Sequence, residues 1–267
     1  MLLLLPPSEG KTPPGRGAPV DLARLSATAL TGARERVMAA AAAVSARPDG
    51  PHVLGVGAAV AADVRHNLVL RTAHAAPAAE VYTGVLYAAA RLGDLTGTAA
   101  RRAADGVRIF SGLWGVLTPR DRVPAYRLSM GVELPGTGRL AAFWRPRLGA
   151  ALDGRADGDV VVDCRSATYA AAWHPPAGAA HVVVQVVREQ GGRRQVVSHN
   201  AKHARGVLTH HLLTRAGRPP RTAEALAGAA EELARAAAGS REVGAVHAVE
   251  LGDPVRGRRT LTLVERA

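Results

Sequence analysis

The chain has 267 residues, of which 48% are hydrophobic but only 3% aromatic, so it can bury a sizeable core made mainly of small aliphatic side chains. Its formal net charge of +12 favours phosphate-bearing partners, although arginines spread over a solvated surface would give the same total. The single cysteine, Cys164, excludes an intrachain disulfide and a zinc or iron–sulfur site built on several thiolates, which fits a reducing, cytoplasmic setting.

The chain opens with a short apolar run, Leu2 to Leu5, that ends at Pro6-Pro7. Four apolar residues are far too few to cross a bilayer, so we predict no membrane association here. A continuous run of this length is typical of a strand buried on both faces. The polar loop that follows, Ser8 to Thr12, is therefore predicted to lie at the end of a buried strand.

Helical spacing follows a Pro/Gly-rich stretch, in an Ala-rich segment over about 21–45 and again over about 57–71. The segment 81–87 contains a Tyr-Thr-Gly turn, and 107–110 reads as a short strand or a helix end. Thr118-Pro119 has the pattern of a helix start, with threonine as the cap and proline at the first helical position. Together these signals predict a hairpin between two short helices around Gly112 to Gly115.

The second half of the chain alternates between Val-rich strands and helices. Strands are predicted over 159–164, 180–187 and 260–264, and a further one beginning at Val196-Val197. Helices are predicted over 201–213 and 222–238, and no internal repeat or linker divides the chain. We therefore predict one mixed α/β (α+β) domain over residues 1–267, with a central β-sheet.

Lys11 and Lys202 are the only lysines among 34 basic residues. An ammonium group can contact phosphate, donate a proton or act as a nucleophile, whereas a guanidinium group does not readily lose its proton. Lys202 and Arg205 lie three positions apart at the start of a predicted helix, so they could bind one anion, or form an ordinary solvated basic face.

Three further groups of residues carry possible chemistry. Gly112 and Gly115 could let backbone amides approach a phosphate, or could simply form a turn. Tyr126-Arg127 could stack on a base and bind a phosphate or carboxylate, although a structural arginine bonded to carbonyls would look the same. Asp163, Ser166 and Tyr169 follow a predicted strand, where open α/β sheets place ligand groups, and could perform acid–base work; helix capping and core packing would also explain Ser166 and Tyr169.

No metal or cofactor site is predicted. His199 and His203 are four residues apart, but no carboxylate completes a metal-binding motif. The chain contains no Walker loop, no Gly-x-Gly-x-x-Gly fingerprint and no Gly-x-Ser-x-Gly elbow. Cofactor-dependent chemistry is therefore not indicated.

Several of these segments, in this order and rough spacing, resemble the YaaA family of peroxide stress proteins. The resemblance implies a compact α/β fold with a basic cleft and a helix-hairpin-helix-like element, DNA binding, and a role in limiting iron-linked peroxide damage. The matching segments are LLLLPPSEGKT from Leu2, VYTG from Val81, SGLWGVLTP from Ser111, PAYRLSMG from Pro124, Phe143-Trp144, DCRSATY from Asp163 and AKHARG from Ala201.

Two functions therefore stay open at this point. The first is DNA binding through sequence-independent phosphate contacts, with Ser8, Lys11, Gly112, Gly115, Tyr126, Arg127, Lys202 and Arg205 as the anion-binding candidates. The second is an enzyme that acts on a nucleoside, a nucleotide or another phosphate-bearing small molecule. Its catalytic candidates are Lys202, Lys11, Asp163, Ser166, Tyr169 and Tyr82.

Overall fold

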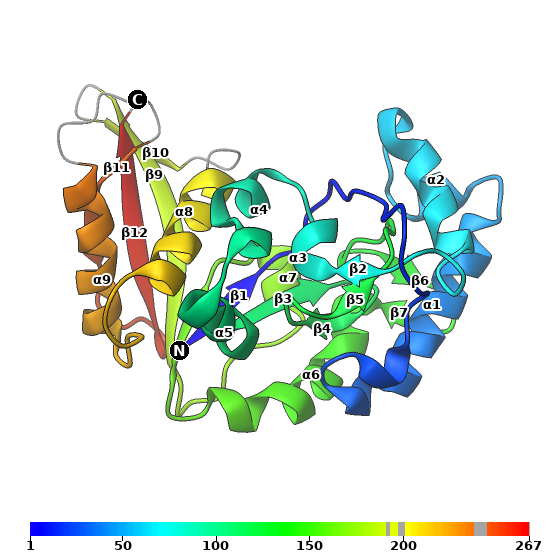
Figure 1. Cartoon of the computed structure of the whole chain (residues 1–267), viewed down its shortest axis with the longest axis horizontal. Coiled ribbons are helices and arrows are strands. Elements are labelled where there is room, and N and C mark those ends of the chain that lie inside the picture. The colour runs from blue at the N-terminus through cyan, green and yellow to red at the C-terminus, as the bar shows by residue number, and fades with distance from the viewer. Residues whose placement is uncertain (191–192, 197–200, 238–244, 267) are drawn as a thin grey trace.

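The computed structural model describes residues 1–190, 193–196, 201–237 and 245–266. An eight-stranded sheet runs through the molecule in the order β11-β12-β9-β8-β1-β3-β4, with β10 paired to β9 (Figure 1). Two small sheets pair β2 with β5 and β6 with β7. The strands are β1 Leu2–Leu5, β2 Ala76–Pro77, β3 Val107–Ser111, β4 Gly115–Leu117, β5 Arg122–Val123, β6 Glu133–Leu134, β7 Gly138–Arg139, β8 Val160–Asp163, β9 Ala180–Gln190, β10 Arg193–Val196, β11 Val246–Leu251 and β12 Arg258–Arg266.

The centre of the sheet is parallel: β1 pairs in parallel with both β3 and β8, and β9 pairs in parallel with β8 and β12. Antiparallel partners occur only at β4, β10 and β11. The predicted strand Leu2–Leu5 is confirmed, and all four leucines are fully buried because both faces of β1 are covered. The prediction of a mixed α/β fold with a central sheet is confirmed as well.

The α-helices are α1 Thr31–Ser45, α2 Gly50–Val53, α3 Ala78–Val81, α4 Val85–Ala90, α5 Gly97–Gly106, α6 Leu140–Ala156, α7 Ala167–Ala170, α8 Ala201–Thr214 and α9 Ala223–Ala236. The helical signal over 57–71 corresponds to a 3₁₀ helix, Ala58–Leu68. Further 3₁₀ helices span Leu22–Arg24, Thr28–Leu30 and Leu92–Asp94.

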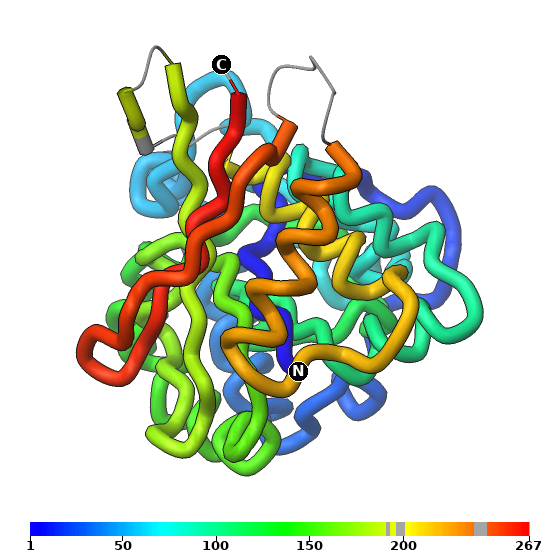
Figure 2. Tube along the Cα trace, turned by 90° about the vertical axis from the view of Figure 1, so that its left-hand side faces the viewer, coloured from blue at the N-terminus to red at the C-terminus, as the bar shows by residue number. Residues whose placement is uncertain are grey.

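Helices α4 and α8 pack unusually close together beside β1 (Figure 1). Gly206 on α8 makes this possible, because a Cβ atom at that position would lie 2.3 Å from the Leu86 carbonyl oxygen on α4. Figure 2 shows α9 lying alongside the neighbouring strands β11 and β12. Close packing of α8 against α4 places the start of α8 near the loop that follows β1.

The predicted helix-hairpin-helix around Gly112 to Gly115 is wrong. These residues form the tight turn of a β-hairpin, in which β3 and β4 pair in antiparallel register. Thr118 and Pro119 do not begin a helix either; they lie in the turn that precedes β5. Close packing requires glycine at both positions. A Cβ at Gly112 would lie 2.8 Å from the Ser129 carbonyl carbon. Gly115 has φ +73° and lies against the Trp144 ring.

In the part of the chain that the structure describes, no helix is long and apolar enough to span a membrane.

Candidate active site

The polar loop after β1 lies at the carboxyl edge of the parallel strands, the edge where α/β proteins commonly bind ligands. Lys11 forms an antiparallel bridge with Tyr82, which fixes the end of the loop to the turn between α3 and α4. The Ser8 hydroxyl accepts a hydrogen bond from the Gly84 amide at 2.7 Å. A Cβ at Gly84 would come within 2.4 Å of that hydroxyl oxygen, so this contact requires glycine.

The Lys11 ammonium group lies among aromatic rings. Its Nζ donates to the Ser8 carbonyl oxygen at 2.7 Å, and it lies 4.2 Å from the centre of the Tyr126 ring and 5.6 Å from that of Tyr82. Burial lowers the pKa of Lys11 to about 8, against the opposing effect of the Glu9 carboxylate. A lysine with this pKa can give up and regain a proton near neutral pH.

A chain of hydroxyl groups runs beneath Lys11. The Ser111 hydroxyl lies 2.7 Å from the Tyr126 hydroxyl, which lies 2.8 Å from that of Tyr82. Ser111 Oγ already accepts from the amides of Leu113 and Trp114, so its own proton points to Tyr126. Burial raises the pKa values of Tyr82 and Tyr126 well above 10, so both stay protonated and the last donor in the chain is the Tyr82 hydroxyl.

Arg127 closes the other side of the site, with acidic groups around it. Its guanidinium donates to the Glu9 carbonyl oxygen at 3.0 Å and lies 3.5 Å from the Glu9 carboxylate and 3.8 Å from that of Asp63. The Asn67 side chain fixes its backbone, accepting from the Arg127 amide at 2.9 Å and donating to its carbonyl oxygen at 2.8 Å. Arg127 is thus held in place and largely neutralised.

Tyr169 joins this site through its phenol group. Its hydroxyl is buried beside the Ser129 side chain and the Met130 backbone, although no group of the described residues reaches good hydrogen-bond geometry with it, and it interacts electrostatically with Glu9 and Arg127. Burial raises the pKa of Tyr169 to about 12, so the phenol remains a hydrogen-bond donor at neutral pH. A buried phenol whose hydrogen-bond contacts have poor geometry can turn its proton to an acceptor atom of a ligand.

Asp163, by contrast, is fully engaged in a buried ion pair. Its carboxylate accepts from Arg165 Nε and Nη2 at 2.8 and 2.7 Å and contacts His181 Nε2 at 3.1 Å. Burial acts to raise the pKa of Asp163, but the hydrogen bonds and charge of Arg165 outweigh it and hold that pKa below its ordinary range. Both carboxylate oxygens are occupied, so this group holds the end of β8 together.

The predicted pair Lys202 and Arg205 separates in the fold. Arg205 donates twice to the Val184 carbonyl oxygen, at 3.3 and 2.8 Å, which ties α8 to β9. Lys202 is exposed, and among the described residues no hydrogen bond or ion pair engages it. Ser166 is exposed as well, at the N-cap of α7, and no side-chain capping bond is formed there.

Lys202 contributes to the wall of a small hollow of about 150 Å³. The rest of the wall comes from the loop after β1, from Pro6 to Gly10, and from the start of α4, from Gly84 to Tyr87. The Tyr87 hydroxyl supports this wall by donating to the Pro6 carbonyl oxygen at 2.7 Å. Lys202 thus approaches from α8 the same loop that carries Lys11.

The site has mixed charge, and the predicted basic cleft is not seen among its residues. The structure brings six of the predicted site residues together: Ser8, Lys11, Tyr82, Tyr126, Arg127 and Tyr169. Five other predicted residues lie outside this site in the described fold: Asp163, Ser166, Arg205, Gly112 and Gly115. Sequence reasoning missed Ser111, Glu9, Asp63 and Asn67 as site residues. Ser111 and Glu9 lie inside segments that the reasoning singled out, but nothing in the sequence marks Asp63 or Asn67.

No group of three or more metal-binding side chains occurs among the residues that the structure describes. Of the two histidines considered from the sequence as a metal-binding pair, His203 lies on α8, whereas His199 lies outside the described residues.

Comparisons with known proteins agree with one another. A family model described as peroxide stress protein YaaA matches residues 1–232. A UPF0246 protein of Streptomyces coelicolor is 44% identical over 226 residues, covering 84% of this chain and 87% of that protein. A UPF0246 protein of Corynebacterium efficiens is 40% identical over 267 residues, covering 99% of this chain and 100% of that protein.

Proposed function

The chain belongs to the YaaA family of peroxide stress proteins, and on that premise we propose that it is an enzyme of the peroxide response that acts on a nucleoside, a nucleotide or another phosphate-bearing small molecule. The observation that carries this proposal is that both lysines of the chain belong to one loop region: Lys11 lies in the loop after β1, and Lys202 lines a hollow with residues Pro6 to Gly10 of that loop. They come from sequence positions far apart, in the loop after β1 and on α8, and all the other residues among the 34 lysines and arginines are arginine.

Each lysine has a distinct role in the proposed reaction. Lys11, with a pKa of about 8, exchanges a proton with the substrate, and the hydroxyl chain that ends at Tyr82 together with the Tyr169 phenol donates hydrogen bonds to it. Lys202, on the wall of the hollow, binds the phosphate through its ammonium group. Arg127 positions the loop through its bonds to Glu9.

The experiment that tests this function starts with ligand screening. Thermal shifts are measured with a panel of nucleosides, nucleotides and sugar phosphates, and hits are followed for turnover by mass spectrometry. We expect Lys11→Met to lower turnover by at least a hundredfold while the ligand still binds. We expect Lys202→Ala to weaken binding about tenfold through loss of one charged contact to phosphate.

Arg235→Ala is the matched control, because Arg235 is an exposed arginine on α9 whose ion-pair partner among the described residues is Glu231. If Lys11 acts as a base, turnover rises with pH and levels off above about 8. Unchanged turnover in Lys11→Met, or a panel in which no compound binds, would overturn the proposal.

A second candidate is DNA binding, favoured by the net charge of +12. In this candidate function, exposed arginines and Lys202 contact DNA phosphates independently of the base sequence. Such binding could limit iron-linked oxidative damage to DNA. The backbone of Gly112 and Gly115 is not part of this candidate, because both glycines are buried in the β-hairpin turn.

A further inference from the structure

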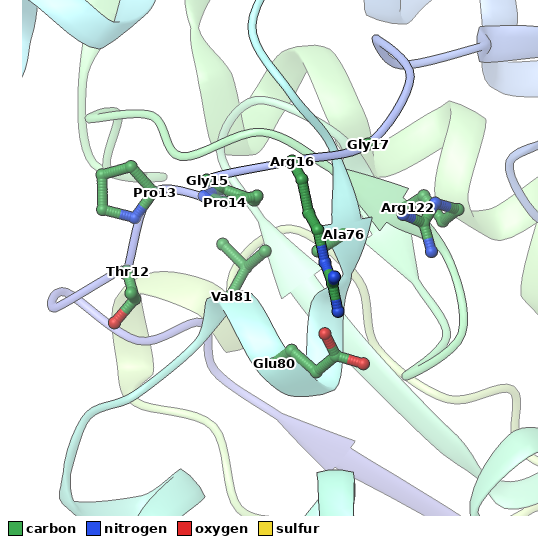
Figure 3. Close-up of a pocket in the computed structure, with 10 residues that line it drawn as sticks. All are labelled: Thr12, Pro13, Pro14, Gly15, Arg16, Gly17, Ala76, Glu80, Val81 and Arg122. Carbon is green, nitrogen blue, oxygen red and sulfur yellow. The ribbon is translucent and has the colours of Figure 1, made fainter.

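A second hollow, of about 560 Å³, lies between the segment 12–17 and helix α3 (Figure 3). Its apolar surface comes from Pro13 and Pro14, and its rim carries Arg16, Glu80 and Arg122. Figure 3 shows the Arg16 side chain reaching down from the loop toward Glu80, with Arg122 beside them. Hollows of this size hold ligands as large as a nucleotide.

The walls of this groove are fixed at several points. The Thr12 amide donates to the Val81 carbonyl oxygen at 2.9 Å, which holds the beginning of the loop on α3. At the other end, Gly17 has φ +125°, and a Cβ there would lie 2.7 Å from the Ala75 carbonyl oxygen. Arg122 Nη2 donates to that same oxygen at 2.7 Å. A ligand would therefore meet a preformed surface and would not have to order the loop first.

The charges on the rim lack partners. Among the described residues, no ion pair or hydrogen bond engages the side chain of Arg16 or of Glu80, and Arg122 uses only one nitrogen, for the Ala75 carbonyl. The groove thus offers two guanidinium groups with free donors and one free carboxylate.

We propose that this groove binds a nucleoside monophosphate. Its phosphate accepts from Arg16 and Arg122, because the planar donor pairs of guanidinium groups match phosphate oxygens. Its ribose hydroxyls donate to the Glu80 carboxylate, and its base lies on the apolar surface of Pro13 and Pro14.

This groove is separate from the lysine site. Lys11 and Tyr82 face each other in an antiparallel bridge, so their side chains point to the same side. The next pair, Thr12 and Val81, points to the opposite side and lines the groove. The two sites therefore lie back to back, and the groove proposal does not depend on the function proposed for Lys11.

The test measures binding by isothermal titration calorimetry in the wild type and in Lys202→Ala, which weakens the lysine site. The probes are AMP, GMP and UMP, with adenosine, 2′-deoxy-AMP and inorganic phosphate for comparison. We expect the ribonucleotides to bind both proteins, Arg16→Ala to weaken this binding at least tenfold, and Glu80→Gln to remove the preference for AMP over deoxy-AMP. Arg235→Ala should change binding by less than twofold.

Three outcomes would overturn the proposal for the groove. They are that no nucleotide binds Lys202→Ala, that adenosine or inorganic phosphate binds as tightly as AMP, or that Arg16→Ala binds the nucleotides as tightly as the wild type does. Arg16 and Glu80 are exposed, so both substitutions leave the fold intact, and circular dichroism checks this. If the function proposed for the lysine site fails instead, turnover is unchanged in Lys11→Met, and nucleotides still bind the groove of that variant.

Discussion

Among single residues, Lys11 shows most clearly how function and stability oppose each other. Its ammonium group is held among tyrosine rings with one carbonyl partner, so the charged form is disfavoured in the folded chain. The pKa falls from an ordinary 10.5 to about 8. Because the folded state binds the proton less tightly than the unfolded state, charging Lys11 destabilises the fold at neutral pH.

We therefore expect Lys11→Met to raise the free energy of unfolding at pH 7 by about 1–3 kcal/mol while it removes turnover. The wild type regains stability between pH 8 and 10.5, where folded Lys11 has lost its proton and unfolded Lys11 still carries one, so the difference should shrink over that window. Urea denaturation at pH 7 and pH 10 measures both values. A variant less stable than the wild type at pH 7 would contradict this account of Lys11.

Asp163 gives the opposite case, a buried charge stabilised by its partners. Replacing it with asparagine leaves Arg165 buried without its counter-charge, and we expect a loss of about 3 kcal/mol at pH 7. Since the folded pKa of Asp163 is depressed, the pair contributes above the unfolded pKa near 4 and is lost as pH falls toward the folded pKa. Denaturation curves at pH 7 and pH 3 for wild type and Asp163→Asn should therefore differ more at pH 7.

Asp49→Asn is the matched control, because Asp49 forms an exposed pair with Arg47, and no measurable change is expected. Equal effects of the two substitutions would show that the Asp163 pair is not a stabilising contact.

At the scale of elements, the contact between α4 and α8 holds the small hollow together. Gly206→Ala places a methyl group against the Leu86 carbonyl and the Ala89 side chain, so α8 must move away from α4 and carry Lys202 with it. We expect a loss of about 2 kcal/mol and weaker ligand binding. Gly228→Ala in α9 is the control, because nothing lies within 4 Å of its added Cβ, and it should gain about 0.5–1 kcal/mol.

Both glycine variants are checked by chemical denaturation and by the thermal shift of the bound ligand. Equal stability of Gly206→Ala and Gly228→Ala would contradict the argument that the contact between α4 and α8 requires glycine at position 206.

Most elements were predictable from local pattern. Leu2–Leu5 is a strand because four apolar residues end at a proline pair, and α9 begins where Thr222 caps the Ala225 amide, at 3.1 Å. The turn at Gly112 to Gly115 was not predictable in this way. Its glycines fit a helix end as well as a hairpin, and only the pairing of β3 with β4 chooses between them.

At the scale of the whole molecule, the net charge of +12 governs any binding to DNA. We expect duplex affinity to fall about a hundredfold between 50 and 200 mM salt if about four phosphates are contacted, with little dependence on sequence. Lys202→Ala should change this affinity by less than about a factor of ten while it weakens small-molecule binding. Fluorescence anisotropy with two unrelated duplexes measures both.

Salt-insensitive binding would contradict DNA binding through phosphate contacts. Complete loss of DNA binding in Lys202→Ala would show that DNA occupies the lysine site and would set aside the small-molecule function.

The sequence by itself determined the central buried strand, the Val-rich strands and the mixed α/β class, because these depend on short-range periodicity and composition. The tertiary structure decided which polar groups meet. It brought Lys202 to the loop of Lys11, placed Asp63 and Glu9 around Arg127, and committed Asp163 and Arg205 to structural contacts. Such contacts join residues that are far apart in the chain, and they follow from strand order and helix packing, which local sequence does not specify.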